Sequence, residues 1–423
     1  MTPETLPGRL GWLATLRLAW RNLRRNKRRT WITAVTVSLA VLLLQLSIAV
    51  MIGVERQSYD NLINYQTAHA KLYAAGYFEN REELPLDYTL TDLEALQASV
   101  RQVSGVAATT PRLAFQASLS DGVDQVACFG TGIQLAGSDT EVFRIPQAIV
   151  AGEYLRPGEE GMLLGSGLAE LFDAEVGDWL TVLTKTRDGA YEALDLPIVG
   201  IVGTGNPVID RNTFLVSLET ARYMLDLQEE ATEVAVRFSL GAREMATLRA
   251  LVERVEQLGY EVKGWREAEA DFLAFAAMKR LGSVAMLSIF VVLALVGVTN
   301  TVLMAAFERT REVGMLMAMG LRGGGVRKLF LTEGALAGLL GGAVGSLLAL
   351  VLIAYLASVG INITALYGEM DIGYPVKDRM YAALEPLTLV VVWLATGLAA
   401  AAASLYPAAR ASRRPPVEAL RHA

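Results

Sequence analysis

The sequence predicts an α-helical membrane protein with four transmembrane helices and a large extracytoplasmic α/β domain inserted between helices 1 and 2. Three observations support this fold class. The chain of 423 residues is 53% hydrophobic and only 19% charged, which is apolar for a soluble protein. Four long segments contain no charged residue. Lysine and arginine are concentrated in three of the segments that flank them.

The uncharged segments are each long enough to cross a bilayer, because about 20 apolar residues rising 1.5 Å each span a core of roughly 30 Å. Four such runs in one chain argue against buried core helices. The first run exceeds the roughly 7–15 apolar residues of a signal peptide, so we expect a retained helix. We assign the spans to residues 30–54, 281–307, 330–357 and 386–409.

The charge distribution predicts the orientation of these helices. Residues 1–29 carry eight Lys or Arg against one acidic residue, the loop 308–329 five against two, and the tail 410–423 four against one. Residues 55–280 carry 35 Asp or Glu against 19 Lys or Arg, a net charge of −16. Because basic segments stay in the cytoplasm, we expect both termini there. The acidic domain and the loop 358–385 are then outside.

The N-terminal segment 9–30 is amphipathic at helical spacing. Arginines lie opposite a face of large apolar side chains, which are Leu13, Leu16, Trp20 and Leu23. Such a helix lies in the membrane interface, with its arginines toward water and anionic lipid. We therefore predict that residues 1–29 form an interfacial helix anchored by Trp20, Arg24 and Arg25. Its juxtamembrane position explains the basic run better than nucleic-acid binding does.

Residues 55–280 are typical of a mixed α/β domain on a two-helix stalk, formed by residues 55–66 and 266–280. Alternating or β-branched runs predict strands at residues 108–120, 124–130, 178–186, 196–203, 212–218 and 232–240. A capping box at residues 91–94 predicts a helix to about residue 103, and further helices are predicted at 167–173, 218–227 and 242–259. We expect an α/β part near the stalk and a more β-rich part around 115–225.

The sequence offers little for catalysis or metal binding. The two histidines, His69 and His422, fall on opposite sides of the membrane in this topology. This leaves no His-based metal site and argues against a Ser-His-Asp triad. We interpret His69 as a packed or hydrogen-bonded histidine and the single cysteine, Cys128, as a small buried apolar residue. We expect no cofactor bound by this chain.

The stretch 307–330, FERTREVGMLMAMGLRGGGVRKLF, contains three consecutive glycines. A phosphate-binding loop needs G-x-x-x-x-G-K-[ST] after a strand, and here no Ser or Thr follows the lysine. We therefore expect no ATP hydrolysis by this chain. We interpret glycines 323–325 as the flexible exit from a helix that runs from about Thr310 to Met319 and ends at Gly320. Adaptable side chains that suit a protein contact would be exposed there, namely Met315, Met317 and Met319.

The third span is rich in glycine at a spacing of four residues. Gly334, Gly338 and Gly342 form one row, and Gly341 and Gly345 form another. Small residues at this spacing let helices approach closely in lipid, where packing drives association. The sequence leaves open whether these rows pack within the chain or against a second copy.

Several motifs together resemble the FtsX/MacB-type (type VII) ABC transporter permeases. They are LAWRNLRRNKRRT near the N-terminus, NTVLMAAFERTREVGMLMAMG, FLTEGALAGLLGGAVG, and LYPAARASRRPPVEALR at the C-terminus. The order of one span, a large outer domain and three spans is also that of the family. The outer-domain phrases TPRL, LLGSGLAELFDAEVGDWLTV and IVGIVGTG look most like the lipoprotein-releasing, LolC/LolE-like branch. The resemblance implies a MacB-like periplasmic domain and a bacterial inner-membrane location.

In that family the loop between spans 2 and 3 carries a coupling helix that docks on a separate ABC-type ATPase, which binds ATP-Mg. The resemblance assigns this role to Glu308, Arg309, Thr310, Arg311, Glu312, Val313, Gly314, Met315, Leu316, Met317, Ala318, Met319 and Gly320. Met317 stands where the family usually has an arginine. The implied function is mechanotransmission: ATPase closure moves the periplasmic domain, which extracts or exports lipoprotein, lipid or another hydrophobic cargo. A second permease chain, identical or related, completes the complex.

Two alternatives remain within the resemblance. One is MacB-like efflux of small amphipathic molecules through a periplasmic adaptor. The other is FtsX-like regulation of a cell-wall hydrolase, although FtsX-like chains usually have a smaller outer domain. No motif in the outer domain identifies the cargo.

Overall fold

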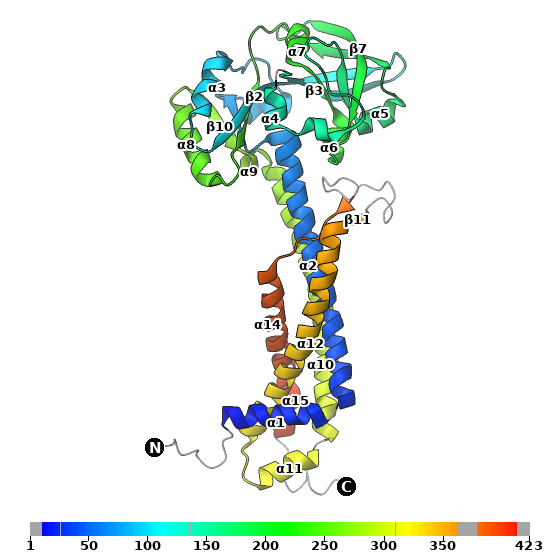
Figure 1. Cartoon of the computed structure of the whole chain (residues 1–423), viewed down its shortest axis with the longest axis vertical. Helices are drawn as coiled ribbons and strands as arrows, with labels where there is room; N and C mark the ends of the chain where they lie inside the picture. Colours follow the sequence, from blue (N-terminus) through cyan, green and yellow to red (C-terminus); the bar gives the residue numbers. More distant parts are fainter. Residues whose placement is uncertain (1–10, 26, 136, 309, 363–378, 413–423) are drawn as a thin grey trace. The chain divides into compact units, whose positions relative to one another are not determined.

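The computed structural model describes residues 11–25, 27–135, 137–308, 310–362 and 379–412 (Figure 1). The chain divides into two compact units. The helical unit consists of the described residues up to Gly53, from Ala276 to Ile361 and from Tyr381 onward, and the α/β unit of those in Val54–Phe275 and Asn362–Met380. Of the predicted tail, residues 413–423 lie outside the described residues, as do residues 363–378 of the predicted outer loop.

The helical unit is made by helices α1 (Trp12–Arg25), α2 (Lys27–Leu62), α10 (Ala270–Glu308), α11 (Thr310–Ala318), α12 (Gly323–Val359), α14 (Pro386–Ala403) and α15 (Leu405–Ser412), with α2 and α10 continuing into the α/β unit. Four apolar helical segments are long enough to cross a membrane: one each in α2, α10 and α12, and one formed by α14 with α15. The four predicted apolar helices are therefore present.

Helices α2 and α10 are much longer than a bilayer requires. They contain 36 and 39 residues, about 54 and 58 Å at 1.5 Å per residue. Their additional turns, with the short helices η1 (Ile63–Thr67) and α9 (Trp265–Ala268), account for the two segments predicted as helical stalk. The helical prediction for both segments is confirmed.

Helix α12 begins earlier than predicted. Glycines 323–325 form its first turn, with Arg322 as an extended N-cap residue, so their interpretation as a flexible exit is wrong. The turn before α12 is made instead by Gly320, whose φ of 97° is a conformation that glycine adopts without strain.

The first glycine row of α12 faces α14 and its junction with α15. An ideal Cβ atom on Gly338 would lie 2.5 Å from the Ala400 Cβ, and one on Gly334 would lie 2.0 Å from the Ser404 Oγ. Gly342 lies against the ring of Trp393, which belongs to α14. These glycines therefore allow a contact between two helices of one chain that a side chain would prevent.

The second glycine row faces α2. An ideal Cβ atom on Gly345 would lie 2.5 Å from the carbonyl oxygen of Ser38, and one on Gly341 would lie 2.9 Å from that of Ala34. Both rows are thus occupied by contacts inside the chain, which favours the intrachain alternative over a contact with a second copy.

The α/β unit is built on one ten-stranded sheet in the order β10-β1-β9-β2-β3-β8-β5-β7-β4, with β6 paired to β2 and β7. The strands are β1 (Ala70–Ala74), β2 (Val106–Ser120), β3 (Gln125–Ile133), β4 (Ile149–Gly152), β5 (Met162–Gly165), β6 (Trp179–Lys185), β7 (Tyr191–Val202), β8 (Thr213–Ser217), β9 (Glu233–Phe238) and β10 (Tyr260–Gly264). The six predicted strands are confirmed. Two short strands, β11 (Ile361–Asn362) and β12 (Arg379–Met380), pair separately.

Three apolar cores lie along this sheet. The first surrounds Phe115 and Phe214, the second surrounds Leu72 and Leu251, and the third surrounds Phe143 and Leu163. The predicted division into two parts corresponds to the first two cores, but the third draws on strands of both parts, and a continuous sheet joins them. The remaining helices are η2 (Phe78–Glu83), α3 (Leu93–Arg101), α4 (Ser138–Val142), η3 (Ile145–Ala148), α5 (Ser166–Phe172), α6 (Pro207–Asn212), α7 (Leu218–Leu225) and α8 (Glu244–Glu256).

The predicted helices at α3, α5, α7 and α8 are confirmed, but the capping box at α3 is wrong. The N-cap residue Asp92 has a left-handed φ of 51° and makes no side-chain capping bond. A side-chain cap requires the extended backbone that lets the oxygen reach the first-turn N–H groups.

His69 and Cys128 are packed, as predicted. The Nδ1 atom of His69 accepts a hydrogen bond of 3.3 Å from the Phe238 N–H, and the two rings stack at 5.2 Å. Cys128 is 4% exposed in the first core, and burial raises the pKa of its thiol to about 12. The thiol is therefore protonated and unreactive at neutral pH.

Replacing Gly345 with valine should destabilise the helical unit, because the new Cβ atom would meet the backbone of Ser38. Overpacking of this kind costs about 1–3 kcal/mol. The matched control is Gly282→Val in α10, where nothing lies within 4 Å of the ideal Cβ. Thermal unfolding of the detergent-solubilised protein should show a lower Tm for the first variant alone. Equal Tm values would contradict the assigned contact.

The stability of the protein should fall as the pH drops from 6.5 toward 4, partly because of His69. Burial, and then the charge of Arg237, lower the pKa of His69 from 6.5 to about 4. The unfolded chain therefore takes up this proton at a higher pH than the folded chain, with at most about one proton bound on unfolding. In His69→Gln, the decline of Tm between these pH values should be shallower. An unchanged decline would show that His69 does not contribute.

Candidate functional site

Helix α11 has one anchored face and one open face. Val313 is 7% exposed and belongs to an apolar cluster with Val37 of α2 and Phe330 of α12. Met317 and Leu321 pack against the same cluster. Val313 and Met317 are spaced by four, so they form one side of the helix, while Leu321 follows the helix end. Together these residues fix α11 within the helical unit.

The open face of α11 carries Met315 and Met319, which are 46% and 75% exposed. The prediction of three exposed methionines is therefore correct for these two and wrong for Met317, which lies one turn after Val313 on the inner side. Arg309, which the resemblance assigns to the coupling site, lies outside the described residues.

The end of α11 is fixed by backbone hydrogen bonds. The Leu321 N–H donates to the Leu316 carbonyl and the Gly320 N–H to the Met317 carbonyl, each at 3.0 Å. This pair of bonds, with the positive φ of Gly320, is a Schellman motif. The predicted helix end at Gly320 is confirmed, and the chain turns there into α12 within a few residues.

The N-terminal helix α1 contacts both α11 and α12. Its Thr15 and Ala19 are fully buried. Asn22 donates a hydrogen bond through Nδ2 to Glu333 Oε1 of α12, and Arg25 forms an ion pair with Glu312 of α11. The structure thus joins the predicted interfacial helix to the predicted coupling helix, which are 287 residues apart in sequence at the ion pair.

The outer face of α1 is apolar, as its periodicity predicted. Trp12, Leu13 and Trp20 are 62%, 70% and 46% exposed, and Arg24 is exposed. This pattern suits a helix lying in a membrane interface. The anchoring roles of Trp20, Arg24 and Arg25 stay predictions.

Sequence reasoning missed two contacts at this site. The hydrogen bond between Asn22 and Glu333 of the third span was not predicted. An uncharged polar residue within a run of arginines gives no signal of its own. The pairing of Arg25 with Glu312 was also missed, because the arginine was assigned to lipid.

Comparison with protein families identifies the class of this protein. Residues 30–258 match the MacB-like periplasmic core domain, and residues 284–416 match the FtsX-like permease C-terminal domain. The chain belongs to the FtsX/MacB-type ABC transporter permeases, and the resemblance stated from the sequence is confirmed.

Curated relatives of this class cover nearly the whole chain. The lipoprotein-releasing system transmembrane protein LolC of Neisseria meningitidis is 26% identical over 96% of this chain and 99% of its own length. LolE of Haemophilus influenzae is 21% identical over 95% and 98%. The pyoverdine export ATP-binding/permease protein PvdT of Pseudomonas fluorescens is 27% identical over 83% of this chain and 54% of its own length.

Breaking the ion pair between Arg25 and Glu312 should loosen α11 without unfolding the protein. Both side chains are partly exposed, so the pair contributes at most about 1 kcal/mol, and hydrogen–deuterium exchange of α11 should accelerate up to about fivefold in Arg25→Glu. The double variant Arg25→Glu/Glu312→Arg should restore protection, and Arg21→Glu on the same helix is the control. Faster exchange in the control to the same extent would contradict a specific pair.

Proposed function

We propose that this chain is the permease subunit of an ABC transporter and that it transmits movement from a separate ATPase, which binds ATP-Mg, to its own periplasmic domain. The observation that carries this proposal is the arrangement of α11. Its inner face is fixed by Val313 and Met317, and its outer face leaves Met315 and Met319 exposed. Exposed adaptable side chains on a short anchored helix suit a docking surface for a partner protein.

The proposed movement passes through contacts of the helical unit. ATPase closure shifts α11, which is joined to α1 by the Arg25–Glu312 pair and to α12 by the turn at Gly320. The cluster around Val313 also includes Val302 of α10 and Val37 of α2. Since α2 and α10 continue as helices into the α/β unit, a tilt of either reaches that unit without passing through a flexible loop.

The proposed orientation follows the basic segments, with both termini and α11 in the cytoplasm and the α/β unit in the periplasm. The proposed cargo is a lipoprotein or another hydrophobic molecule taken from the inner membrane. The near full-length similarity to LolC and LolE, proteins of lipoprotein-releasing systems, supports this choice. A second permease chain, identical or related, would complete the complex.

Similarity to a pyoverdine export protein favours a second candidate function, the export of a small amphipathic molecule through a periplasmic adaptor. Depletion of the chain in its host separates the two. Lipoproteins should accumulate in the inner membrane if the first proposal is correct. Retention of a small molecule with normal lipoprotein sorting would favour the second.

The double variant Met315→Asp/Met319→Asp should lose the ATPase that copurifies with the wild-type complex. Charges on the open face would be desolvated at the contact, and loss of two apolar anchors should weaken binding about tenfold or more. The matched control is Met245→Asp, a methionine of α8 whose exposed fraction, 58%, lies between those of Met315 and Met319. Copurification and Tm should be measured together. An ATPase retained by a correctly folded double variant would refute this docking surface.

A further inference from the structure

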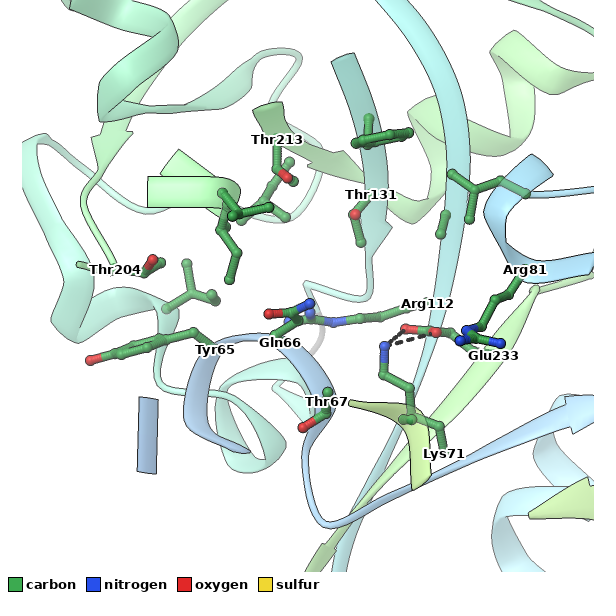
Figure 2. Close-up of a pocket in the computed structure, with 18 of the residues that line it drawn as sticks. Tyr65, Gln66, Thr67, Lys71, Arg81, Arg112, Thr131, Thr204, Thr213 and Glu233 are labelled. Carbon is green, nitrogen blue, oxygen red and sulfur yellow. Dashed lines mark hydrogen bonds and ion pairs between the residues drawn. The ribbon is translucent and has the colours of Figure 1, made fainter. Parts of the chain in front are cut away.

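A cavity of about 350 Å³ lies within the α/β unit, against the sheet (Figure 2). Seven neighbouring strands contribute to its wall, in the spatial order β1, β9, β2, β3, β8, β5 and β7. Helix η1 and residues 268–269 close part of it. Its volume falls within the range of about 300–1,000 Å³ that small-molecule sites occupy.

One end of the cavity is charged. Figure 2 shows Lys71, Arg81, Arg112 and Glu233 gathered on one side, with the Lys71 ammonium 2.8 Å from Glu233. Arg112 donates two hydrogen bonds, of 2.8 and 3.1 Å, to the fully buried Asp139. These are buried groups that are already paired, since a buried charge without a partner is costly.

The charged side chains that line the cavity already have partners. Lys71 pairs with Glu233, Arg112 pairs with Asp139, and Arg81 lies 3.8 Å from Asp271. Glu269 accepts a hydrogen bond of 3.2 Å from the side-chain amide of Gln66. Asp210 accepts hydrogen bonds from the N–H groups of residues 204 and 205. An ion entering this space would therefore find no uncompensated charge to pair with, whereas hydroxyl or amide groups can still share the hydrogen-bonding edges of these side chains.

The other end of the cavity is mainly apolar, with a few hydroxyl groups and the hydrogen-bonded carboxylate of Asp210. Its apolar lining includes Phe129, Leu163, Val208, Ile209 and Leu215. The threonines Thr131, Thr204 and Thr213 lie on this side in Figure 2, away from the charged cluster. The cavity thus has a mainly apolar region and a polar region whose charged side chains are already paired, which is the complement of an amphipathic molecule without net charge.

We propose that this cavity binds a small uncharged amphipathic molecule, such as a short-chain monoacylglycerol. The chain lies among Phe129, Leu163 and Leu215, and the hydroxyl head lies at the end formed by Lys71 and Glu233. The site belongs to the α/β unit alone. It does not rest on the proposed ATPase coupling, and its test contains neither ATP nor an ATPase.

The test uses the full chain in lipid nanodiscs with Cys128→Ala, which removes the native thiol, and Thr131→Cys, which places a thiol at the cavity wall. Monooctanoylglycerol at saturation should slow maleimide labelling of this thiol at least tenfold. Octanoate and octyltrimethylammonium, which share the chain but carry a charge, should require at least tenfold higher concentrations. Val123→Cys in the same background is 88% exposed and should be unaffected by all three.

A second variant separates occupancy from a change of folding. Thr131→Trp should fill the cavity and weaken binding of radiolabelled monooctanoylglycerol at least tenfold, whereas Thr181→Trp on β6, outside the cavity lining, should not. No protection of the Thr131→Cys thiol would overturn the proposal. Equal protection by octanoate would overturn the assignment of an uncharged head, and so would preferential protection by the cation.

Discussion

Close approach between helix backbones is the constraint on which the helical unit depends. In lipid, apolar side chains gain nothing by leaving their surroundings, so helices associate through packing at short distance. Adjacent residues of a helix point about 100° apart, so the neighbouring Gly341 and Gly342 belong to two different faces of α12. One row of glycines meets α2 and the other meets α14, and α12 is the element against which both are positioned.

The packing of these helices also fixes the position of α11. The apolar cluster beneath Val313 draws residues from α2, α10, α12, α14 and α15, so α11 is attached to five other helices of the helical unit. At Gly320 the chain turns directly toward α12, so no long linker separates α11 from that helix. An arginine at position 317, which the resemblance to the family led us to expect, would have to leave this cluster, and the methionine found here packs against it instead. As a result, the open face of α11 presents two methionines rather than the three that the sequence predicted.

Sequence reasoning predicted most of what depends on local pattern. Uncharged runs predicted the four apolar helices, and alternation predicted β2, β3, β6, β7, β8 and β9. Strands β1, β4, β5 and β10 were missed because four or five residues are too few to show a period on their own. Strand β8 is equally short, but its TFLVS is rich in β-branched and aromatic residues, whereas the fully buried MLLG of β5 has neither. The partners of Asn22 and Arg25 were missed for a different reason. A contact between residues about 300 positions apart leaves no trace in either segment alone.

The buried charges of the α/β unit specify how its strands pair and also form part of the cavity wall. Strand β2 contributes to all three apolar cores of this unit, and its Arg112 lies directly opposite Glu233 of β9. A slip of one residue would turn Arg112 to the other face and separate it from Asp139, so the charges specify the register as well as the cavity wall. Removing any one of them would leave another unpaired and destabilise the fold whether or not a ligand binds. At the mainly apolar end of the cavity, Thr131 can be changed without leaving a charge unpaired. Substitutions at this end can therefore distinguish ligand binding in the cavity from an effect on folding.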